Sequence, residues 1–450
     1  MTLIIVAILL LCYLLIATEN LTNVNKAATV VFAGTLAWIL YIAYGADYVM
    51  RFHPDEYVAF INGESPSSAT VKEFIAQNVF LKYVGRASEI VMFLLATMTI
   101  VEVLTNNGCF DFVMHLLKTR NSRKMLWIFA SVAFLFSINL DNLSTTVMML
   151  TIMHKVIGNR RQRMVYGAAI VIAANCGGAL TVIGDPAGLV LWTQGCVTAT
   201  NFSMTLLVPC LIAWLLPTWW IGRLLPERCD TEWITMPYRG DDTRLNGWQR
   251  LLMLFVGIGG LWFIPSFHSI TKLSPFIGAL CVLGVLWIVN EIFNHRLYNS
   301  DQLLRRKVPG AMQYGVLQMM FFVMGMMLLM GVVCESGAID WFMQKSGVYI
   351  KDTWLMGLVA GFVSAILDNF ATAITFFHLG DHVELNGIYW KVIAFASGVG
   401  GNILCIGSLS GIALMKLERM HVGWYFRNVG WKSLVGMLIG LAAMFLLNYQ

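Results

Sequence analysis

The chain is 450 residues long, 58% hydrophobic and 12% charged, with a formal net charge of +5. Soluble domains contain about 25% charged residues, and the mean hydropathy here is +0.71, so a soluble globular fold is excluded. The composition predicts an all-α protein that crosses a membrane many times. The positive charge is accounted for by Lys and Arg in the loops and does not indicate a nucleic-acid partner.

The first apolar segments predict membrane spans at 2–17 and 27–44. The earlier span lacks a basic beginning and a small-residue cleavage site, so we expect a retained helix and not a signal peptide. Residues 45–87 form the longest polar insertion, in which an amphipathic stretch at 69–83 is expected to lie on the membrane surface. A third span is predicted at 88–106.

A polar island at Asp141–Thr146 separates two apolar segments, each shorter than the about 20 residues that a spanning helix needs. Lys and Arg cluster on both outer flanks, at 118–124 and 155–163, and such clusters mark the cytoplasmic side. The pattern predicts a re-entrant hairpin, residues 124–158, that enters and leaves the membrane on that side. The polar island then forms its tip.

A second polar island, Asp368–Ala373, predicts a second hairpin at 351–380. Its flanks carry sparse charges of both signs, so we expect this hairpin to enter from the outside. Two related hairpins of opposite orientation indicate a transporter that is built from inverted repeats.

Each hairpin is followed by an apolar segment that glycines interrupt. The first, 163–199, is broken at Gly177-Gly178 and again at 184–188, where Asp185 precedes a proline. The second, 388–418, contains Gly400-Gly401-Asn402 and a further break at 407–411. Such interruptions are typical of the broken helices of transporters.

The other apolar segments complete a count of ten crossings and two hairpins, with both termini outside the cell. A turn through Pro265 is expected between two of these spans, and a cluster at 305–307 is expected on the cytoplasmic side. The remaining spans are predicted at 203–221, 248–264, 274–293, 311–333 and 430–447.

The repeat is also visible in the sequence register. Asp141-Asn142 and Asp368-Asn369 are 227 residues apart, and Gly178 with Gly184 matches Gly401 with Gly407 at an offset of 223. Matches in order with a slowly drifting offset indicate an internal duplication. The predicted domains are N-terminal scaffold helices with an outside loop (1–87), a first repeat (88–221), cytoplasmic loops with scaffold helices (222–310) and a second, inverted repeat (311–450).

The polar residues of the tips and breaks are the candidate site. An aspartate at a tip can simply cap the helix that follows it, although a neutral cap would cost less desolvation in a membrane. Alternatively, the side-chain oxygens bind a monovalent cation, and a carboxylate that holds either the cation or a proton is the minimum apparatus for exchange. The candidate cation and proton ligands are Asp141, Asn142, Ser144, Thr145, Asp185, Asp368, Asn369, Thr372, Asn402 and Ser408.

Other ionisable residues have two interpretations each. Asp185 corresponds to Ser408 in the second repeat, so it either adds charge to one site or caps the helix at Pro186. Glu102 either needs a buried partner or snorkels to the cytoplasmic surface. His154 and His378 occupy comparable places in the two hairpins, where they could tune a proton path or pack at the interface.

Four segments of the chain resemble the signature segments of NhaD-type sodium/proton antiporters. They are Asn139–Thr145, Ile183–Pro186, Leu367–Thr372 and Gly401–Ser408, and the resemblance extends over roughly 85–447. It implies a secondary Na⁺(Li⁺)/H⁺ antiporter of a bacterial inner membrane, with the proposed Na⁺ ligands Asp141, Asn142, Asp368 and Asn369. It also implies a homodimer that moves by an elevator mechanism, surrounded by lipid and without a cofactor beyond the transported ion.

The wider superfamily leaves two transport alternatives. Sodium-coupled di- or tricarboxylate symporters have serine where this chain has Asp141 and Asp368, and added carboxylates favour an antiporter over an anion carrier. For an arsenite or oxyanion efflux permease, Cys176 and Cys405 beside the breaks would matter. A non-transporting membrane scaffold does not account for the paired hairpins. No nucleotide-binding loop is recognisable in the sequence, so neither ATP-driven transport nor an enzyme is indicated.

Overall fold

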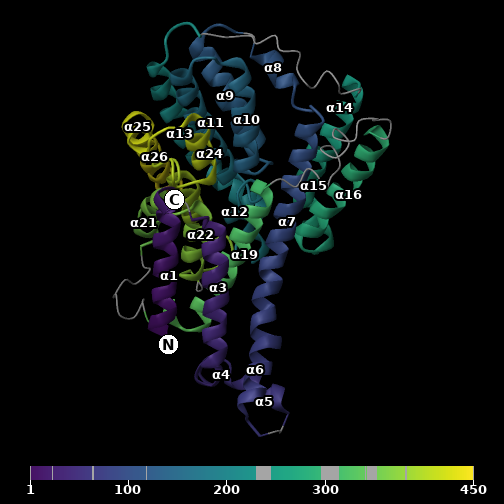
Figure 1. The fold of residues 1–450 in the computed structure, drawn as a ribbon, viewed down its shortest axis with the longest axis vertical. Coiled ribbons are helices and arrows are strands. Elements are labelled where there is room, and N and C mark those ends of the chain that lie inside the picture. Colours follow the sequence, from purple (N-terminus) through teal and green to yellow (C-terminus); the bar gives the residue numbers. More distant parts are fainter. Residues whose placement is uncertain are drawn as a thin grey trace. The chain divides into compact units, whose positions relative to one another are not determined.

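The computed structural model describes residues 2–22, 24–62, 65–117, 119–229, 245–294, 314–339, 341, 352–380 and 383–448, and within these residues the regular structure is helical (Figure 1). The predicted cluster at 305–307 lies outside the described residues. The chain forms two compact units. Unit 1 comprises Met1–Val91, Leu317–Lys351 and Ile374–Asp381, and unit 2 comprises Met92–Val316, Asp352–Ala373 and His382–Gln450.

Eight helical stretches in the described part are long and apolar enough to cross a membrane. Two further predicted crossings correspond to the 16-residue helix α1 (Thr2–Ala17) and to the interrupted segment 388–418. The predicted fold class, an all-α polytopic membrane protein, is therefore confirmed. The eight stretches are Lys26–Ala43, Ser68–Asn106, Arg160–Leu180, Ala199–Leu224, Gly247–Thr271, Pro275–Asn294, Val316–Glu335 and Val422–Asn448.

The prediction that residues 69–83 form a separate helix on the membrane surface is wrong. Helix α6 (Ser68–Phe74), the π-helical turn η1 (Ile75–Phe80) and α7 (Leu81–Asn106) form one continuous helix of 39 residues. Its beginning is fixed by a capping box at Ser67. Its apolar side chains at 71, 74, 75 and 79 are buried, so the amphipathic pattern marks a helix face packed within unit 1 and not a face laid on lipid.

The prediction of a turn at Pro265 is also wrong. Helix α14 (Gly247–Leu254), the π-helical turn η3 (Phe255–Gly259) and α15 (Gly260–Thr271) run on through this proline, and the chain turns only at Lys272, where φ is +59°. A transmembrane helix tolerates an internal proline because an exposed break in lipid would leave more backbone groups unsatisfied.

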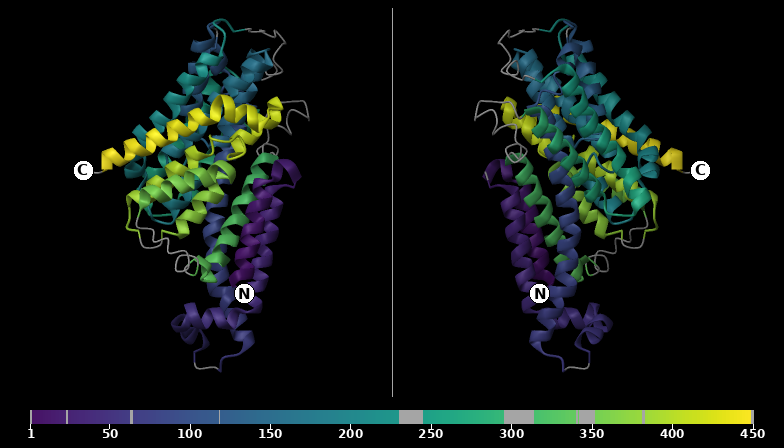
Figure 2. Two further views of the ribbon diagram at one scale, coloured as in Figure 1. Left: turned by 90° about the vertical axis from the view of Figure 1, so that its left-hand side faces the viewer. Right: turned by 90° about the vertical axis from the view of Figure 1, so that its right-hand side faces the viewer.

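Unit 1 packs α3 (Lys26–Ala43) closely against α19 (Tyr314–Glu335). A Cβ on Gly325 would lie 2.8 Å from the backbone nitrogen of Val31, so only glycine permits this approach. The indole of Trp38 donates a hydrogen bond to the Leu328 carbonyl at 3.0 Å. Helices α1, α3 and α19 lie side by side in both views of Figure 2.

Unit 2 contains the first hairpin, both interrupted helices and the second hairpin as far as Ala373, whereas the rest of the second arm, from Ile374, belongs to unit 1. Its hairpins turn at 138–141 and 367–368, and its interrupted helices break at 181–185 and 401–408. Helices α13 (Ala199–Ile221) and α26 (Trp431–Asn448) pack against each other beside them. The four arms of the hairpins are α9 (Ser122–Ser137), α10 (Asn142–Val156), α21 (Thr353–Ile366) and α22 (Asn369–His378). The four halves of the interrupted helices are α11 (Arg160–Leu180), α12 (Pro186–Thr193), α23 (Ile388–Gly400) and α24 (Leu409–Glu418).

The two halves of unit 2 repeat the same contacts. The hydroxyl of Ser137 donates to the Ala174 carbonyl at 2.6 Å, and that of Ser364 donates to the Ser397 carbonyl at 2.6 Å. These residues are related by the offsets of 227 and 223 that relate the sequence motifs. The contacts therefore support the predicted duplication, while its inversion across a membrane and the domain boundaries stay predictions.

The first hairpin begins and ends at the same end of unit 2. The Tyr166 hydroxyl, in the second turn of α11, donates to the carbonyl of Ser122 at the beginning of α9, at 3.1 Å. Helix α10 ends at Val156, only four residues before α11 begins. A re-entrant hairpin requires this arrangement, whereas a single crossing formed by α9 and α10 together would place the two flanks on opposite sides of a membrane.

We expect residues 119–123 and 159–163 to label from the same, cytoplasmic, side of the membrane. Cysteines introduced singly for the exposed residues Arg120 and Arg161, in a background without the nine native cysteines, should react only after the membrane is permeabilised. A cysteine at Ser65, in the loop expected outside, is the matched control and should react in intact cells. Labelling of positions 120 and 161 from opposite faces would contradict the re-entrant hairpin.

Candidate ion-binding site

Three aspartates precede helices at the tips and breaks of unit 2. One oxygen of Asp141 accepts the backbone N–H of Ser144 at 2.8 Å, at the beginning of α10. Asp368 accepts from the Phe370 N–H at 3.0 Å, and Asp185 accepts from the Ala187 N–H at 2.9 Å, at the beginning of α12. Each aspartate therefore caps a helix, as the simpler interpretation predicts. The caps at Asp141 and Asp185 each engage one oxygen of the carboxylate.

The second oxygen of Asp185 joins the two hairpin tips. It accepts from the side-chain amide of Asn142 at 3.1 Å and from that of Asn369 at 2.7 Å. These asparagines are repeat equivalents, 227 residues apart. Asp185 is thus both a helix cap and the acceptor on which both hairpins converge, so the two interpretations of this residue do not exclude each other.

Asn175, in the last turns of α11, extends this network into the second repeat. Its side-chain oxygen accepts from Asn142 at 3.3 Å, and its amide donates to Asn402 at 2.8 Å and to the Ser408 hydroxyl at 3.0 Å. The sequence interpretation missed Asn175. The available signal was a single amide side chain in the apolar run that leads to Gly177-Gly178. We call Asn142, Asn175, Asp185, Asn369, Asn402 and Ser408 the Asp185 network.

Backbone packing holds the tip of the first hairpin against the first break. A Cβ on Gly184 would lie 2.5 Å from the Ser137 carbonyl oxygen, and one on Gly407 would collide with the equivalent carbonyl of Ser364. The Thr181 hydroxyl, in the break, donates to the carbonyl of Ile138, in the hairpin turn. The polar side chains of tip and break are therefore positioned by contacts of the main chain.

Several oxygen atoms near the network are buried and, within the described structure, accept or donate no hydrogen bond. They are Oδ2 of Asp141 and the hydroxyls of Thr145 and Thr372. The two threonines are repeat equivalents, one turn into the second arm of each hairpin, and both are fully buried. An unsatisfied buried polar group costs about 1–3 kcal/mol, so these atoms are suited to serve as ligands of a cation.

The electrostatics of the region also favour a cation. Asp141, Asp185 and Asp368 are at most 5% exposed, and they lie at the two hairpin tips and at the break whose asparagine and aspartate side chains this network joins. The Asp185 network itself contains no Lys, Arg or His. Like charges in a low-dielectric interior repel strongly, so these carboxylates require protons or a bound cation to remain together.

The other sequence candidates lie outside this network. Ser144 contributes its backbone N–H to the Asp141 cap, and its side chain is partly exposed. Nδ1 of His154 lies 3.1 Å from a carboxylate oxygen of Glu418, and Nδ1 of His378 lies 2.8 Å from the Ile374 carbonyl. Glu102 lies near the end of α7. A role of Glu102, His154 and His378 in a proton path stays a prediction.

Comparison with known proteins agrees with this geometry. The family model described as a citrate transporter matches residues 13–400. The chain belongs to this transporter family. Within the family, the resemblance to NhaD-type antiporters is confirmed by relatives that cover most of the chain.

Three relatives show the range of sequence identity and coverage. Sodium/proton antiporter 2 of Arabidopsis thaliana is 30% identical over 365 residues, which are 79% of this chain and 84% of that protein. Sodium/proton antiporter 1 of the same plant is 32% identical over 80% of this chain, but the chain spans only 62% of that protein's length. The Na⁺/H⁺ antiporter NhaD of Alkalimonas amylolytica is 26% identical over 98% of this chain and 90% of that protein.

Asn175→Ala should lower the thermal stability of the purified protein, because it leaves polar atoms of Asn142, Asn402 and Ser408 without their partner. The expected loss is about 1–3 kcal/mol for each buried group left unsatisfied, measured as a lower midpoint of thermal unfolding in detergent. Asn201→Ala, at an exposed asparagine of α13, is the matched control and should stay within about 0.5 kcal/mol of the native protein. Equal unfolding midpoints for the two variants would show that the hydrogen bonds of Asn175 do not stabilise the fold.

Proposed function

We propose that this protein is a secondary antiporter that exchanges Na⁺ for protons. The observation that carries the proposal is the convergence of both hairpin tips on the single carboxylate of Asp185, which is buried, as are the tip aspartates Asp141 and Asp368. The names of the relatives, sodium/proton antiporters of a plant and of several bacteria, support it.

Competition between ions provides the exchange. Three buried aspartates cannot all be charged without a counter-ion, so protons occupy some of them when no metal ion is bound. Na⁺ is a hard cation that prefers oxygen ligands, and broken transporter helices supply these near the membrane midplane. Asp141 Oδ2, the Thr145 and Thr372 hydroxyls and the carboxylate of Asp185 are the proposed ligands, with Asn142, Asn369, Asn402 and Ser408 holding them in place. Binding of Na⁺ then expels a proton, and protonation expels Na⁺.

Access to the two sides follows from the repeats. The proposed repeats, 88–221 and 311–450, supply one hairpin and one interrupted helix each, so movement that exposes one tip to water can bury the other. We extend to this chain the homodimer, the elevator-like movement, the inner-membrane location and Li⁺ as a second substrate, all of which the resemblance implies.

Two alternatives are weighed against specific contacts. The description of the matching family model favours a citrate or related carboxylate as substrate. The Asp185 network, however, offers no basic side chain to an anion, and it contains one carboxylate and adjoins those of Asp141 and Asp368. For arsenite, the thiols would have to be available. Cys176 accepts from the Asn402 amide at 3.8 Å, and Cys405 donates to the Gly411 carbonyl at 3.0 Å, so both thiols have partners inside the fold.

A flux assay separates these functions. In proteoliposomes that contain the purified full chain and an internal pH dye, a pulse of Na⁺ or Li⁺ should move protons in the opposite direction. Citrate or succinate added with a constant Na⁺ concentration should produce no further flux. Na⁺-dependent accumulation of labelled citrate without proton counter-movement would contradict the proposed antiport and indicate a sodium-coupled symporter.

Asp141→Asn should abolish Na⁺-driven proton movement in this assay and leave a folded protein. Asparagine can still cap α10, but it cannot release a proton or neutralise a bound cation. The matched control is Asp352→Asn, because Asp352 caps α21 by accepting from the Trp354 and Leu355 N–H groups at an exposed position. The control should retain the native rate of Na⁺-driven proton movement. Exchange by Asp141→Asn at the native rate would contradict the role proposed for the Asp141 carboxylate.

A further inference from the structure

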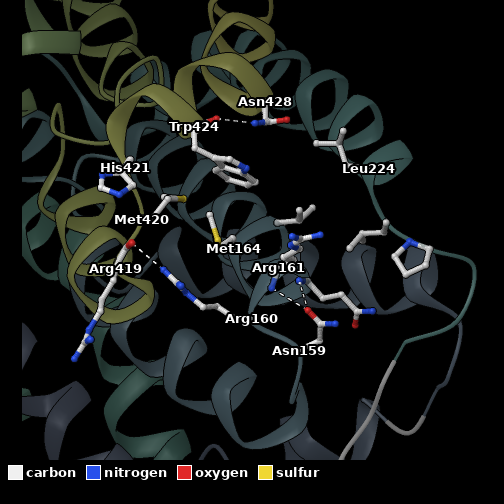
Figure 3. A pocket seen from close by; sticks show the side chains of 14 residues that line it. Asn159, Arg160, Arg161, Met164, Leu224, Arg419, Met420, His421, Trp424 and Asn428 are labelled. Carbon is white, nitrogen blue, oxygen red and sulfur yellow. Dashed lines mark hydrogen bonds between the residues drawn. The ribbon is translucent and has the colours of Figure 1, made fainter.

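A cavity of about 700 Å³ lies in unit 2, where α11 begins and α24 ends (Figure 3). It is separate from the proposed ion site, since no residue of the Asp185 network lines it. Three segments of the chain line it: the beginning of α11, the segment after α13 and the segment after α24. The lining residues are Asn159, Arg160, Arg161, Gln162, Met164, Val165, Leu224, Leu225, Pro226, Arg419, Met420, His421, Trp424 and Asn428.

Part of the lining is basic. Arg160, Arg161, Arg419 and His421 contribute to it, and none of its fourteen described residues is acidic. Two acidic residues adjoin the lining in the sequence. Glu227 is exposed, and Glu418 is buried and occupied by Arg163, whose Nε lies 2.9 Å from its carboxylate. The uncompensated charge of the rim therefore favours an anion.

Another part of the lining is apolar. Met164, Val165, Leu225 and Trp424 contribute to it, and Leu224 is 44% exposed. Figure 3 shows the indole of Trp424 and the side chain of Met164 close to Arg161. A small inorganic anion would use only the basic rim, whereas a ligand with both an anionic group and a hydrocarbon chain would use the whole cavity.

The surroundings resemble a membrane–water boundary. The Arg223 guanidinium lies over the Trp219 ring at 3.9 Å, and the rings of Trp220 and Trp431 are 5.2 Å apart. Trp219 and Trp431 are both more than one-third exposed. Tryptophans with cationic neighbours gather at the level of lipid headgroups, and basic pockets between helices at that level suit anionic headgroups.

We propose that this cavity binds an anionic phospholipid, with the phosphate on Arg160 and Arg161 and an acyl chain on the apolar part of the lining. The site also has a structural consequence. Arg160 donates to the carbonyls of Glu418 at 2.7 and 3.0 Å and of Arg419 at 2.9 Å, so it connects the beginning of α11 to the end of α24. A bound lipid therefore stabilises the junction between one interrupted helix of each repeat.

The test uses Arg161→Gln in the full chain, purified in a neutral detergent. Phosphatidylglycerol, phosphatidylcholine and inorganic phosphate are titrated separately, and the midpoint of thermal unfolding is followed. Arg161 is exposed and only its backbone N–H enters the helix cap, at 2.9 Å from Asn159 Oδ1, so its side chain is dispensable for folding. Arg123→Gln is the matched control, because Arg123 follows Asn121 in the same cap geometry at the beginning of α9 but does not line the cavity.

Phosphatidylglycerol should raise the midpoint more than phosphatidylcholine does. Arg161→Gln should shift the phosphatidylglycerol titration to roughly fivefold higher concentration, the effect of one arginine near an anionic headgroup, while Arg123→Gln leaves it in place. Equal shifts of the phosphatidylglycerol titration in the two variants would show that general surface charge causes the effect, and would overturn the proposal. Stabilisation by inorganic phosphate that equals that by phosphatidylglycerol would also overturn it, in favour of a free-anion site. Because the readout is binding, either result is independent of whether the protein exchanges Na⁺ for protons.

Discussion

The cost of holding carboxylates together in a low-dielectric interior constrains the centre of this protein. Asp141, Asp185 and Asp368 are almost fully buried, and each is placed where a helix begins, so a backbone N–H meets one of its oxygens. The partial positive charge at a helix beginning offsets part of the desolvation cost of a carboxylate. It does not offset the repulsion among three of them. The remaining imbalance is what a proton or a cation can satisfy, and this is why an exchange mechanism suits the geometry.

The duplication explains how the chain builds such a centre, and its imperfection explains why the centre is not symmetric. Ser137 and Ser364 make equivalent contacts, and Gly184 and Gly407 allow equivalent close approaches. The residue after each of these glycines differs. Asp185 caps α12 in the first repeat and Ser408 caps α24 in the second, so only the first break offers a charged acceptor, and both hairpin asparagines donate to it. A symmetric scaffold thereby presents one charged acceptor.

The sequence predicted the parts of the fold that have local signatures. Glycine, proline and aspartate inside apolar stretches located both hairpin tips and the breaks near Asp185 and Gly401–Ser408, and the register located the repeat. The break predicted at Gly177-Gly178 is wrong, because α11 continues through these glycines to Leu180. Three features lacked such signatures. Asn175 contacts residues 33, 227 and 233 positions away, so no local pattern shows its role. The helix at 69–83 is amphipathic because it packs within unit 1, and amphipathicity alone does not distinguish protein from lipid surface. Pro265 predicts a turn in water, whereas in a membrane-spanning helix the backbone continues.

Helices α11 and α24 connect the candidate ion site to a second group of contacts at their other ends. Helix α11 carries Asn175 near its end and Arg160 and Arg163 at its beginning, while α24 begins after Ser408 and ends with Glu418. The two helices are therefore joined twice, by the amide of Asn175 on Ser408 and by Arg163 on the buried carboxylate of Glu418. Removing one partner from a buried ion pair costs about 3–5 kcal/mol, because the other charge is left unpaired. Any movement that separates α11 from α24 at the ion site must also disturb this second junction, unless both helices move as one body. The double attachment thus favours a transport movement in which the two interrupted helices travel together and their neighbours rearrange.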